Sequence, residues 1–229
     1  MSLQTHEFVS KDALNTEFSA KITDILQNAI VQKGNASLIV SGGNTPKPLF
    51  AQLSTADIDW DKVTISLADD RWVDVTDDAS NDKLVREHLL VNNASKATFI
   101  SLKHDFANAA DAVEACEAAI SDVQMPFDVL ILGMGEDGHT ASLFPCSEQL
   151  QAGLDLYSGK KYIAVQPTTA PHQRMSLTLP ALLASSNIFL HSTGESKKAV
   201  IAKALESTES EMPIKAVLER ANVQLMWAP

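Results

Sequence analysis

The segment Phe127-Asp-Val-Leu-Ile-Leu132 is the clearest buried strand in the sequence, and it runs straight into Gly133-Met-Gly-Glu-Asp-Gly-His139. A short apolar run that stops at glycine is typical of a strand buried on both faces of a parallel sheet. In such sheets the ligands bind in the loops that follow the carboxyl ends of the strands. The segment therefore predicts an α/β fold and a candidate site in the loop after Leu132.

Segments typical of strands and of helices alternate along the rest of the chain. Apolar residues recur at helical spacing over residues 10–33, with Ser10 placed to cap the start of the helix and Gly34 to end it. Further helices are expected at 46–53, 81–90, 108–120 and 196–205, and further strands at 36–40, 63–67, around 99, 162–165, 175–179, 188–190 and 223–226. This order predicts an open, mainly parallel sheet with helices on both faces. Because no repeat or Pro/Ser-rich linker interrupts it, we expect one domain over residues 1–229.

The charge of the chain limits its partners. Eighteen Lys and Arg residues stand against 29 Asp and Glu, which gives a formal net charge of -11. A field of that sign disfavours nucleic acid and acidic membrane surfaces as partners. An anionic small molecule would therefore need a local site with convergent donors.

The cysteines and the N-terminal residues indicate a cytoplasmic protein. Cys116 and Cys146 are the two cysteines, and neither belongs to a CxxC pair. Such a composition suits a reducing compartment. The first residues show no basic region followed by an apolar run, and no segment has the apolar length that a membrane span requires.

The loop Ser41-Gly-Gly-Asn-Thr45 lies between an expected buried strand and an expected helix. Paired glycines let the backbone approach a ligand closely, and a helix N-terminus offers free N–H groups to an anion. Ser41 and Thr45 add hydroxyl donors. An ordinary strand-to-helix turn explains the loop about as well, and a Walker loop is excluded because the required Lys-Ser/Thr ending is missing.

Three basic residues are placed where they could reach the same edge of the sheet. Arg71 follows the strand at 63–67, Arg174 precedes Met175, and Lys197 lies near the start of the helix at 196–205. Arginine suits bidentate binding of phosphate. Alternatively, Arg71 pairs with a neighbouring carboxylate or stacks on Trp72, and the lysine is solvated.

The run from Gly133 to Gly138 matches GxGxxG after a strand, the pattern of a dinucleotide-binding turn. We reject that interpretation. Glu136 and Asp137 would repel a pyrophosphate, and Pro145 halts the following segment early. The glycines instead shape a loop that presents Asp137 and His139.

His139 is the side chain suited to act as a general base near neutral pH, and Asp137 is close enough in sequence to orient it. A structural or surface histidine is the alternative. A metal site would need more ligands than one carboxylate and one histidine supply. Cys146 has little support as a nucleophile, and the chain contains no GxSxG elbow.

Taken together, these blocks resemble the 6-phosphogluconolactonase family over most of the chain. The most specific block is Gly133-Met-Gly-Glu-Asp-Gly-His-Thr-Ala-Ser-Leu-Phe-Pro145. The supporting blocks are Ser41-Gly-Gly-Asn-Thr-Pro46, Asp69-Asp-Arg-Trp-Val73 with Ser80-Asn81, Arg174-Met-Ser-Leu-Thr-Leu-Pro180 and Gly194-Glu-Ser-Lys197. The family's fold is similar to that of the glucosamine-6-phosphate deaminases and ribose-5-phosphate isomerases, in agreement with the alternation of strands and helices.

The resemblance implies a carboxylic-ester hydrolase that converts 6-phospho-D-glucono-1,5-lactone into 6-phospho-D-gluconate in the oxidative pentose phosphate pathway. It implies His139 as the base that activates water and Asp137 as the residue that orients it. It implies no cofactor and no metal. Loop N–H groups near Gly138 are candidates for stabilising the oxyanion. The residues expected to hold the substrate and its phosphate are Ser41, Gly42, Gly43, Asn44, Thr45, Asp69, Arg71, Gly138, Arg174 and Lys197.

Two positions depart from the family's pattern, and two other functions compete. Asp70 stands where glutamate is common, and Asn44 where serine or threonine is common, which puts the fine positioning of the substrate in doubt. A glucosamine-6-phosphate deaminase or sugar-phosphate isomerase is disfavoured by the ending Ala-Ser-Leu-Phe-Pro145, since Asn-Glu-Pro is expected there. A sensor of sugar phosphates would keep the pocket without the chemistry. The expected partner is the small-molecule substrate, and the expected state is a monomer or weak homodimer.

Overall fold

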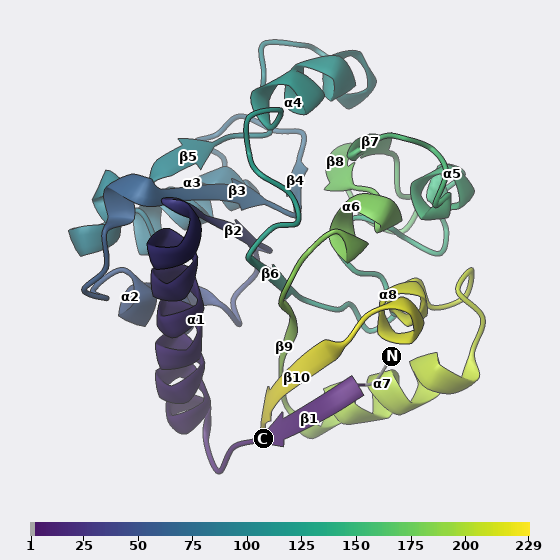
Figure 1. Ribbon diagram of the computed structural model, residues 1–229. Coiled ribbons are helices and arrows are strands. Elements are labelled where there is room, and N and C mark those ends of the chain that lie inside the picture. The colour runs from purple at the N-terminus through teal and green to yellow at the C-terminus, as the bar shows by residue number, and fades with distance from the viewer. Residues whose placement is uncertain (1–2) are drawn as a thin grey trace.

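The computed structural model describes residues 3–229, and within them seven parallel strands form the main sheet (Figure 1). Across the sheet the strands are β1 (Leu3–Glu7), β10 (Val223–Ala228), β9 (Ile188–Thr193), β6 (Val129–Leu132), β2 (Ala36–Val40), β3 (Val63–Leu67) and β5 (Thr98–Ile100). Every neighbouring pair is parallel. The central register pairs Val40 with Ile131 and Leu132 with Leu190, so β2 and β6 end within one residue of each other and β9 continues three residues farther.

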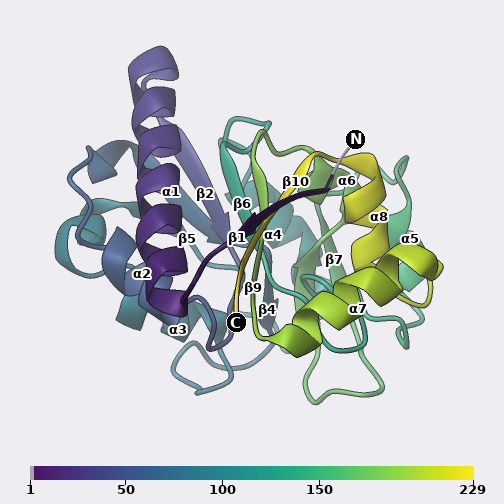
Figure 2. The same cartoon turned by 90° about the horizontal axis from the view of Figure 1, so that it is seen from below.

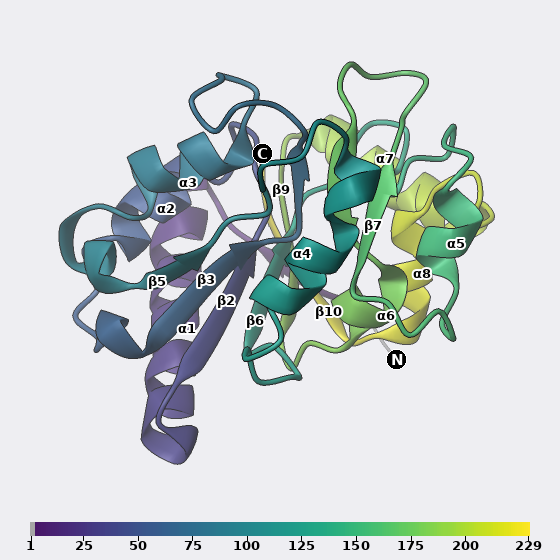
Figure 3. The ribbon, with the colours of Figure 1, turned by 90° about the horizontal axis from the view of Figure 1, so that it is seen from above.

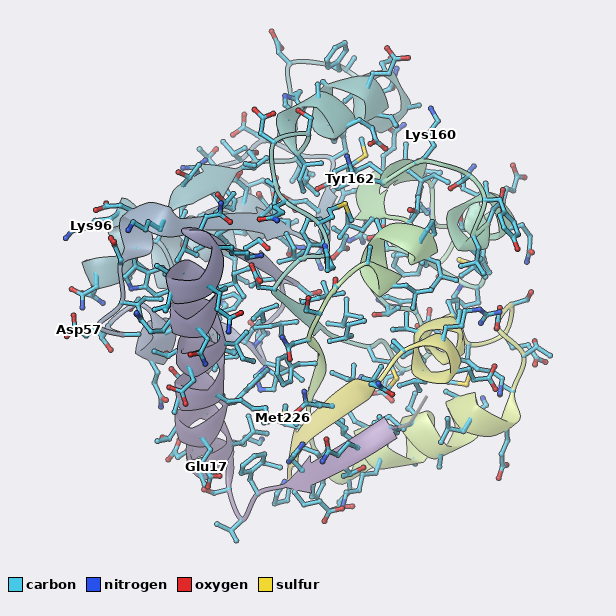
Figure 4. The ribbon with its side chains drawn as sticks, viewed as in Figure 1. Glu17, Asp57, Lys96, Lys160, Tyr162 and Met226 are labelled. Carbon is cyan, nitrogen blue, oxygen red and sulfur yellow. The ribbon has the colours of Figure 1, made fainter. Side chains whose placement is uncertain are left out.

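A smaller antiparallel sheet stands beside the main one. Its strands, in order, are β4 (Asp69–Arg71), β8 (Arg174–Leu177) and β7 (Tyr162–Val165). Arg71 pairs with Arg174 in the register of β4 and β8. Tyr162, labelled in Figure 4, is buried at the start of β7. The expected strand near Tyr162 is thus confirmed, but it belongs to this second sheet.

Helices cover both faces of the main sheet. The structure has α1 (Lys11–Lys33), α2 (Lys47–Leu53), α3 (Asn81–His88), α4 (Val113–Ala119), α5 (Leu150–Leu154), α6 (Leu179–Leu183), α7 (Glu195–Glu206) and α8 (Ile214–Arg220), with short 3-10 turns at Trp60–Lys62, Asn92–Lys96 and Ala109–Ala112. α1 packs against β2, β6 and β10. α1 and α7 lie toward the viewer in Figure 2, whereas α4 and β7 do so in Figure 3. The predicted α/β architecture is confirmed.

α1 forms as its sequence predicts. Leu14, Phe18, Ile22 and Leu26 recur at intervals of four and are fully buried. The Ser10 hydroxyl accepts a hydrogen bond from the Ala13 N–H at 3.2 Å, which caps the first turn. Gly34 ends the helix with a left-handed φ of 83°.

Some element boundaries differ from the sequence expectation. The strand expected over 127–132 begins at Val129, because the side chain of Asp128 turns to bind Ser37. The strand expected over 175–179 ends at Leu177, since Leu179 and Pro180 already form the first turn of α6. The helix expected over 108–120 is split into a 3-10 turn and α4. No helix within residues 3–229 has the length and apolar character that crossing a membrane requires.

Asp128 joins β2 to β6 at the edge of the sheet opposite the carboxyl ends. Its Oδ2 accepts hydrogen bonds from the Ser37 N–H at 2.8 Å and from the Ser37 hydroxyl at 3.1 Å. Its Oδ1 lies 2.8 Å from the Lys33 ammonium at the end of α1. Because Asp128 and Ser37 are both buried, removal of the carboxylate would leave polar groups without partners.

We therefore expect Asp128→Ala to lower the free energy of unfolding by about 2–4 kcal/mol. Urea denaturation monitored by circular dichroism measures the change. The matched control is Asp59→Ala, which removes an exposed ion pair of 3.3 Å with Lys62. The control should change the stability by less than about 1 kcal/mol, and an equal loss in both variants would contradict the role of Asp128.

Candidate active site

A cavity of about 250 Å³ opens at the carboxyl ends of β2, β6 and β9. The small sheet and the loop after β6 complete its wall. It is lined by Ser41, Gly42, Gly43, Thr45, Pro46, Asp69, Arg71, Asn81, Ile131, Leu132, Gly133, Met134, Gly135, His139, Ala141, Phe144, Arg174, His191, Ser192, Thr193 and Lys197. The expectation that the loops after the strands meet at one edge is thus met by the geometry.

His139 is held in one orientation at the cavity. Its Nδ1 lies 2.6 Å from Oδ1 of Asp137, and its backbone N–H donates to the same oxygen at 3.2 Å. Its ring stacks on Phe144 with the ring centroids 4.1 Å apart. Because Nδ1 is engaged with the carboxylate, Nε2 is the nitrogen left for proton transfer to or from a ligand.

The geometry also explains the charge state of Asp137. Partial burial opposes its ionisation, but the hydrogen bonds and the charge of His139 prevail and hold the pKa of Asp137 below its ordinary value. Asp137 is therefore an anion next to the imidazole. An anion in that place stabilises the protonated form of a histidine base.

Gly135 leaves room for the Asp137 and His139 side chains. A Cβ atom at Gly135 would lie 2.2 Å from Nδ1 of His139 and 2.5 Å from Oδ1 of Asp137. The Gly135 N–H donates to the carbonyl oxygen of His139 at 2.9 Å. The glycine that matched a dinucleotide fingerprint thus makes room for the carboxylate–imidazole pair.

The glycine loop lines the same cavity through Ser41, Gly42, Gly43 and Thr45. Gly43 has a φ of 100°, a left-handed conformation that other residues rarely adopt. Asn44, in contrast, is exposed and does not line the cavity.

Arg71 reaches the cavity through contacts that the sequence did not predict. Its Nη1 donates to the carbonyl oxygen of Ala79 at 2.8 Å and to Oδ1 of Asn81 at 3.2 Å. Within residues 3–229 its guanidinium makes no ion pair with Asp69 or Asp70. These contacts fix the guanidinium while it faces the cavity.

Arg174 lies beside Arg71 and is almost fully buried. Its guanidinium stands over the ring of Phe144, 5.6 Å from the centroid, and donates to the Pro171 carbonyl oxygen at 3.2 Å. Burial and the charge of Arg71 lower the pKa of Arg174. The guanidinium nevertheless remains charged near neutral pH. Two guanidinium groups side by side make a strong local attraction for an anion in a chain of net charge -11.

The two aspartates that precede Arg71 have different environments. Asp69 lines the cavity, and its Oδ2 accepts a hydrogen bond from the Ser142 hydroxyl. Asp70 turns to the start of α3, where its carboxylate accepts from the N–H groups of Asn81 and Asp82. Burial raises the pKa of Asp70 to about 6 in spite of those donors. Asp70 thus caps the start of α3, whereas Asp69 lines the cavity.

Lys197 closes the cavity from the start of α7. Its Nζ donates to the carbonyl oxygen of Met134 at 3.0 Å and lies 2.7 Å from Oε1 of Glu136. The solvated state that the sequence left open therefore does not occur here. The lysine is oriented by the same loop that carries His139.

Two further expected residues stand apart from the cavity wall. Asp137 contacts His139 but, like Gly138, is not among the lining residues. The Gly138 N–H donates to the carbonyl oxygen of Gly135 at 3.1 Å, and its Cα faces Met212. This N–H is therefore engaged within the loop.

Four residues that line the cavity were not among the expected site residues: Asn81, Phe144, His191 and Ser192. Asn81 and Phe144 occur in the blocks that resemble the family, but no role was assigned to them. His191 and Ser192 directly follow the strand expected over 188–190, and no local pattern marks them as site residues. Among residues 3–229, no three His, Cys, Asp or Glu side chains are grouped so that they could hold a metal ion.

Comparison with known proteins places this geometry in a family. Residues 9–227 match the family model described as glucosamine-6-phosphate isomerases/6-phosphogluconolactonase. The 6-phosphogluconolactonase of Pseudomonas putida is 39% identical over 229 residues, which are 100% of this chain and 94% of the relative. The 6-phosphogluconolactonase of Neisseria meningitidis serogroup B is 40% identical over 222 residues, 95% of each chain.

Solved structures agree with the sequence comparison. A crystal structure of a 6-phosphogluconolactonase from Shewanella baltica superimposes with a TM-score of 0.97 at 45% identity and covers 100% of this chain and 98% of its own. A monomeric glucosamine-6-phosphate deaminase has a TM-score of 0.81 at 16% identity, with 99% and 97% of the two chains covered. The second likeness shows a shared fold.

The contact between Gly42 and Asn81 gives a prediction. A Cβ atom at Gly42 would lie 1.8 Å from Oδ1 of Asn81, whose amide also donates to the Asp69 carbonyl oxygen. We expect Gly42→Ala to displace Asn81 and to lower the free energy of unfolding by about 1–3 kcal/mol.

A double-mutant cycle with Asn81→Ala, measured by urea denaturation, tests the cause. The clash disappears when the asparagine is truncated, so Gly42→Ala should cost little in the Asn81→Ala background. Additive losses would show that Gly42 acts through another contact.

Proposed function

Because the chain belongs to the glucosamine-6-phosphate isomerase/6-phosphogluconolactonase family and is an enzyme of its 6-phosphogluconolactonase branch, we propose that it hydrolyses 6-phospho-D-glucono-1,5-lactone with His139 as the general base. The product is 6-phospho-D-gluconate, and the reaction would serve the oxidative pentose phosphate pathway. The observation that carries the proposal is the His139–Asp137 pair, with Nδ1 2.6 Å from the carboxylate, at a cavity that Arg71, Arg174 and Lys197 also line.

Base catalysis follows from the orientation of the imidazole. Nε2 of His139 takes a proton from water, and the oxygen of that water forms a bond with the lactone carbonyl carbon. Asp137 stabilises the imidazolium that results. When the tetrahedral intermediate collapses, the bond to the ring oxygen breaks, and the imidazolium returns the proton to that oxygen. A positioned base of this kind typically contributes about 10²–10⁴-fold to the rate.

The cations and the glycine loop would hold the phosphate. Arg71 and Arg174 suit phosphate because a guanidinium donates to two oxygens at once. Lys197 would exchange the carboxylate of Glu136 for the phosphate. Binding energy from this remote group positions the lactone for attack.

Asp69 has a different task because an anion would repel the phosphate. Its carboxylate lines the cavity and is already bound by the Ser142 hydroxyl. We assign to it the sugar hydroxyls, which donate hydrogen bonds to a carboxylate. This division places an acceptor for the sugar and donors for the phosphate in one cavity.

A deaminase is the second candidate, and it shares the fold. The relatives that are 39–45% identical are named 6-phosphogluconolactonases, whereas the deaminase is 16% identical. The sequence after His139, ending in Phe144 and Pro145, also favours the lactonase. The substrate test therefore compares the two reactions directly.

The wild-type chain should accelerate the hydrolysis of freshly generated 6-phosphogluconolactone above its spontaneous opening. Coupled 6-phosphogluconate dehydrogenase reports the product, and ammonia release from glucosamine 6-phosphate is measured in parallel. We expect acceleration of the first reaction alone. Ammonia release alone would move the chain to the deaminases, and binding of sugar phosphates without turnover would make it a sensor.

His139→Ala should lower kcat by about 10²–10⁴-fold and leave KM within a few-fold, because the base is lost and the phosphate contacts remain. Initial rates corrected for spontaneous hydrolysis give both constants. His88→Ala, which changes a histidine of α3 outside the cavity lining, is the control and should keep wild-type rates. Full activity of His139→Ala would remove His139 from the mechanism.

A further inference from the structure

His191 is a histidine in the floor of the cavity that the mechanism above does not use. It lies on β9, in register with Met226 of β10, which Figure 4 labels. The ring is 5% exposed and meets Phe18 of α1 edge-on, with centroids 5.4 Å apart. His191 lines the same cavity as His139 and Lys197.

The ring nitrogens of His191 are buried and have no hydrogen-bond partner among residues 3–229. Burial lowers the pKa of His191 to about 4, so the imidazole is neutral near pH 7. A neutral imidazole has one N–H donor and one acceptor. Buried polar groups are almost always paired in folded proteins, so an unpaired ring at a cavity points to a ligand.

Two serine hydroxyls share this condition. The Oγ atoms of Ser41 and Ser192 are buried and have no partner within the described residues. Ser41 follows β2 and Ser192 follows His191 on β9, and both line the cavity. Three residues with unpaired polar side chains therefore line one cavity at the carboxyl edge of the main sheet.

The space next to His191 is open. Leu190 pairs with Leu132, the last residue of β6, so Gly133 follows β6 at the level where His191 follows Leu190. A Cβ atom at Gly133 would meet nothing within 4 Å. A ligand group can therefore approach the imidazole over this glycine.

We propose that His191, with Ser41 and Ser192, forms a neutral hydrogen-bonding floor that binds the phosphate group of the substrate. The inference rests on the proposed function. Two hydroxyls and an imidazole N–H are donors, and phosphate oxygens accept several hydrogen bonds at once. The glycine loop, Thr45 and Lys197 line the same cavity and favour an anion there. A purely structural ring that packs on Phe18 is the alternative.

His191→Phe separates the two roles, since phenylalanine keeps the ring and its contact with Phe18 but removes both nitrogens. We expect KM for 6-phosphogluconolactone to rise about 10-fold or more, as for a lost hydrogen bond to a charged group. kcat should stay within a few-fold. The hydrolysis of glucono-1,5-lactone, which lacks the phosphate, should not change. The melting temperature should not fall, because an unpaired buried polar group has been replaced by an apolar one.

Two further variants control the experiment. His191→Gln keeps a donor and an acceptor and should restore part of the KM. His6→Phe removes another histidine whose Nε2 is buried and unpaired, but on the edge strand β1 and outside the cavity lining. It should leave KM unchanged. An unchanged KM in His191→Phe, or an equal rise with the unphosphorylated lactone, would overturn the proposal.

A binding measurement keeps the inference testable apart from turnover. The ¹⁵N resonances of the His191 ring are followed while 6-phosphogluconate, and separately gluconate, is added to the wild-type protein. A shift with the phosphorylated acid alone supports the floor, and no shift in spite of binding contradicts it. If the wild type fails to hydrolyse the lactone but its His191 shifts with inorganic phosphate, the proposed function fails and the phosphate floor stands.

Discussion

The parallel hydrogen bonding of β2, β6 and β9 is the constraint on which the site depends. The loops that follow parallel strands emerge at one edge of the sheet, and here the loops after β2, β6 and β9 line one cavity. The glycine loop, the His139 loop and the start of α7 therefore surround one cavity although they are far apart in the sequence. Asp128 joins β2 to β6 at the opposite edge of the sheet and does not line the cavity.

The small antiparallel sheet supplies the two arginines of the cavity. The pairing of β4 with β8 brings Arg71 and Arg174 together, although the two residues are far apart in the sequence. Asp70 and Asn81 then fix the start of α3 against this sheet, so that Arg71 keeps its orientation. A chain with an excess of acidic residues thereby gains a positive site of limited extent.

Most of the fold was predictable because its signals are local. The period of the buried residues in α1, its caps at Ser10 and Gly34, and the apolar runs of β2 and β6 follow from sequence alone. β1 and β4 were missed because they are short and polar, and their pairing with β10 and β8 depends on residues far away in the chain. The loops of the site could likewise be predicted from their local sequence. The contact of Asn81 with Gly42 and the unpaired ring of His191 could not. Such contacts depend on tertiary packing, which propensity does not encode.

Phe144 contacts two residues to which the proposed function gives roles at different ends of the substrate. One ring stacks on His139 at 4.1 Å and also carries the guanidinium of Arg174 at 5.6 Å. His139 and Arg174 are thus both held by contacts with one aromatic side chain. In the proposed function the first acts at the lactone carbonyl and the second at the phosphate, so one ring would help to set the positions of both contacts. Phe144 would then influence the fit of both ends of the substrate without forming a hydrogen bond with either.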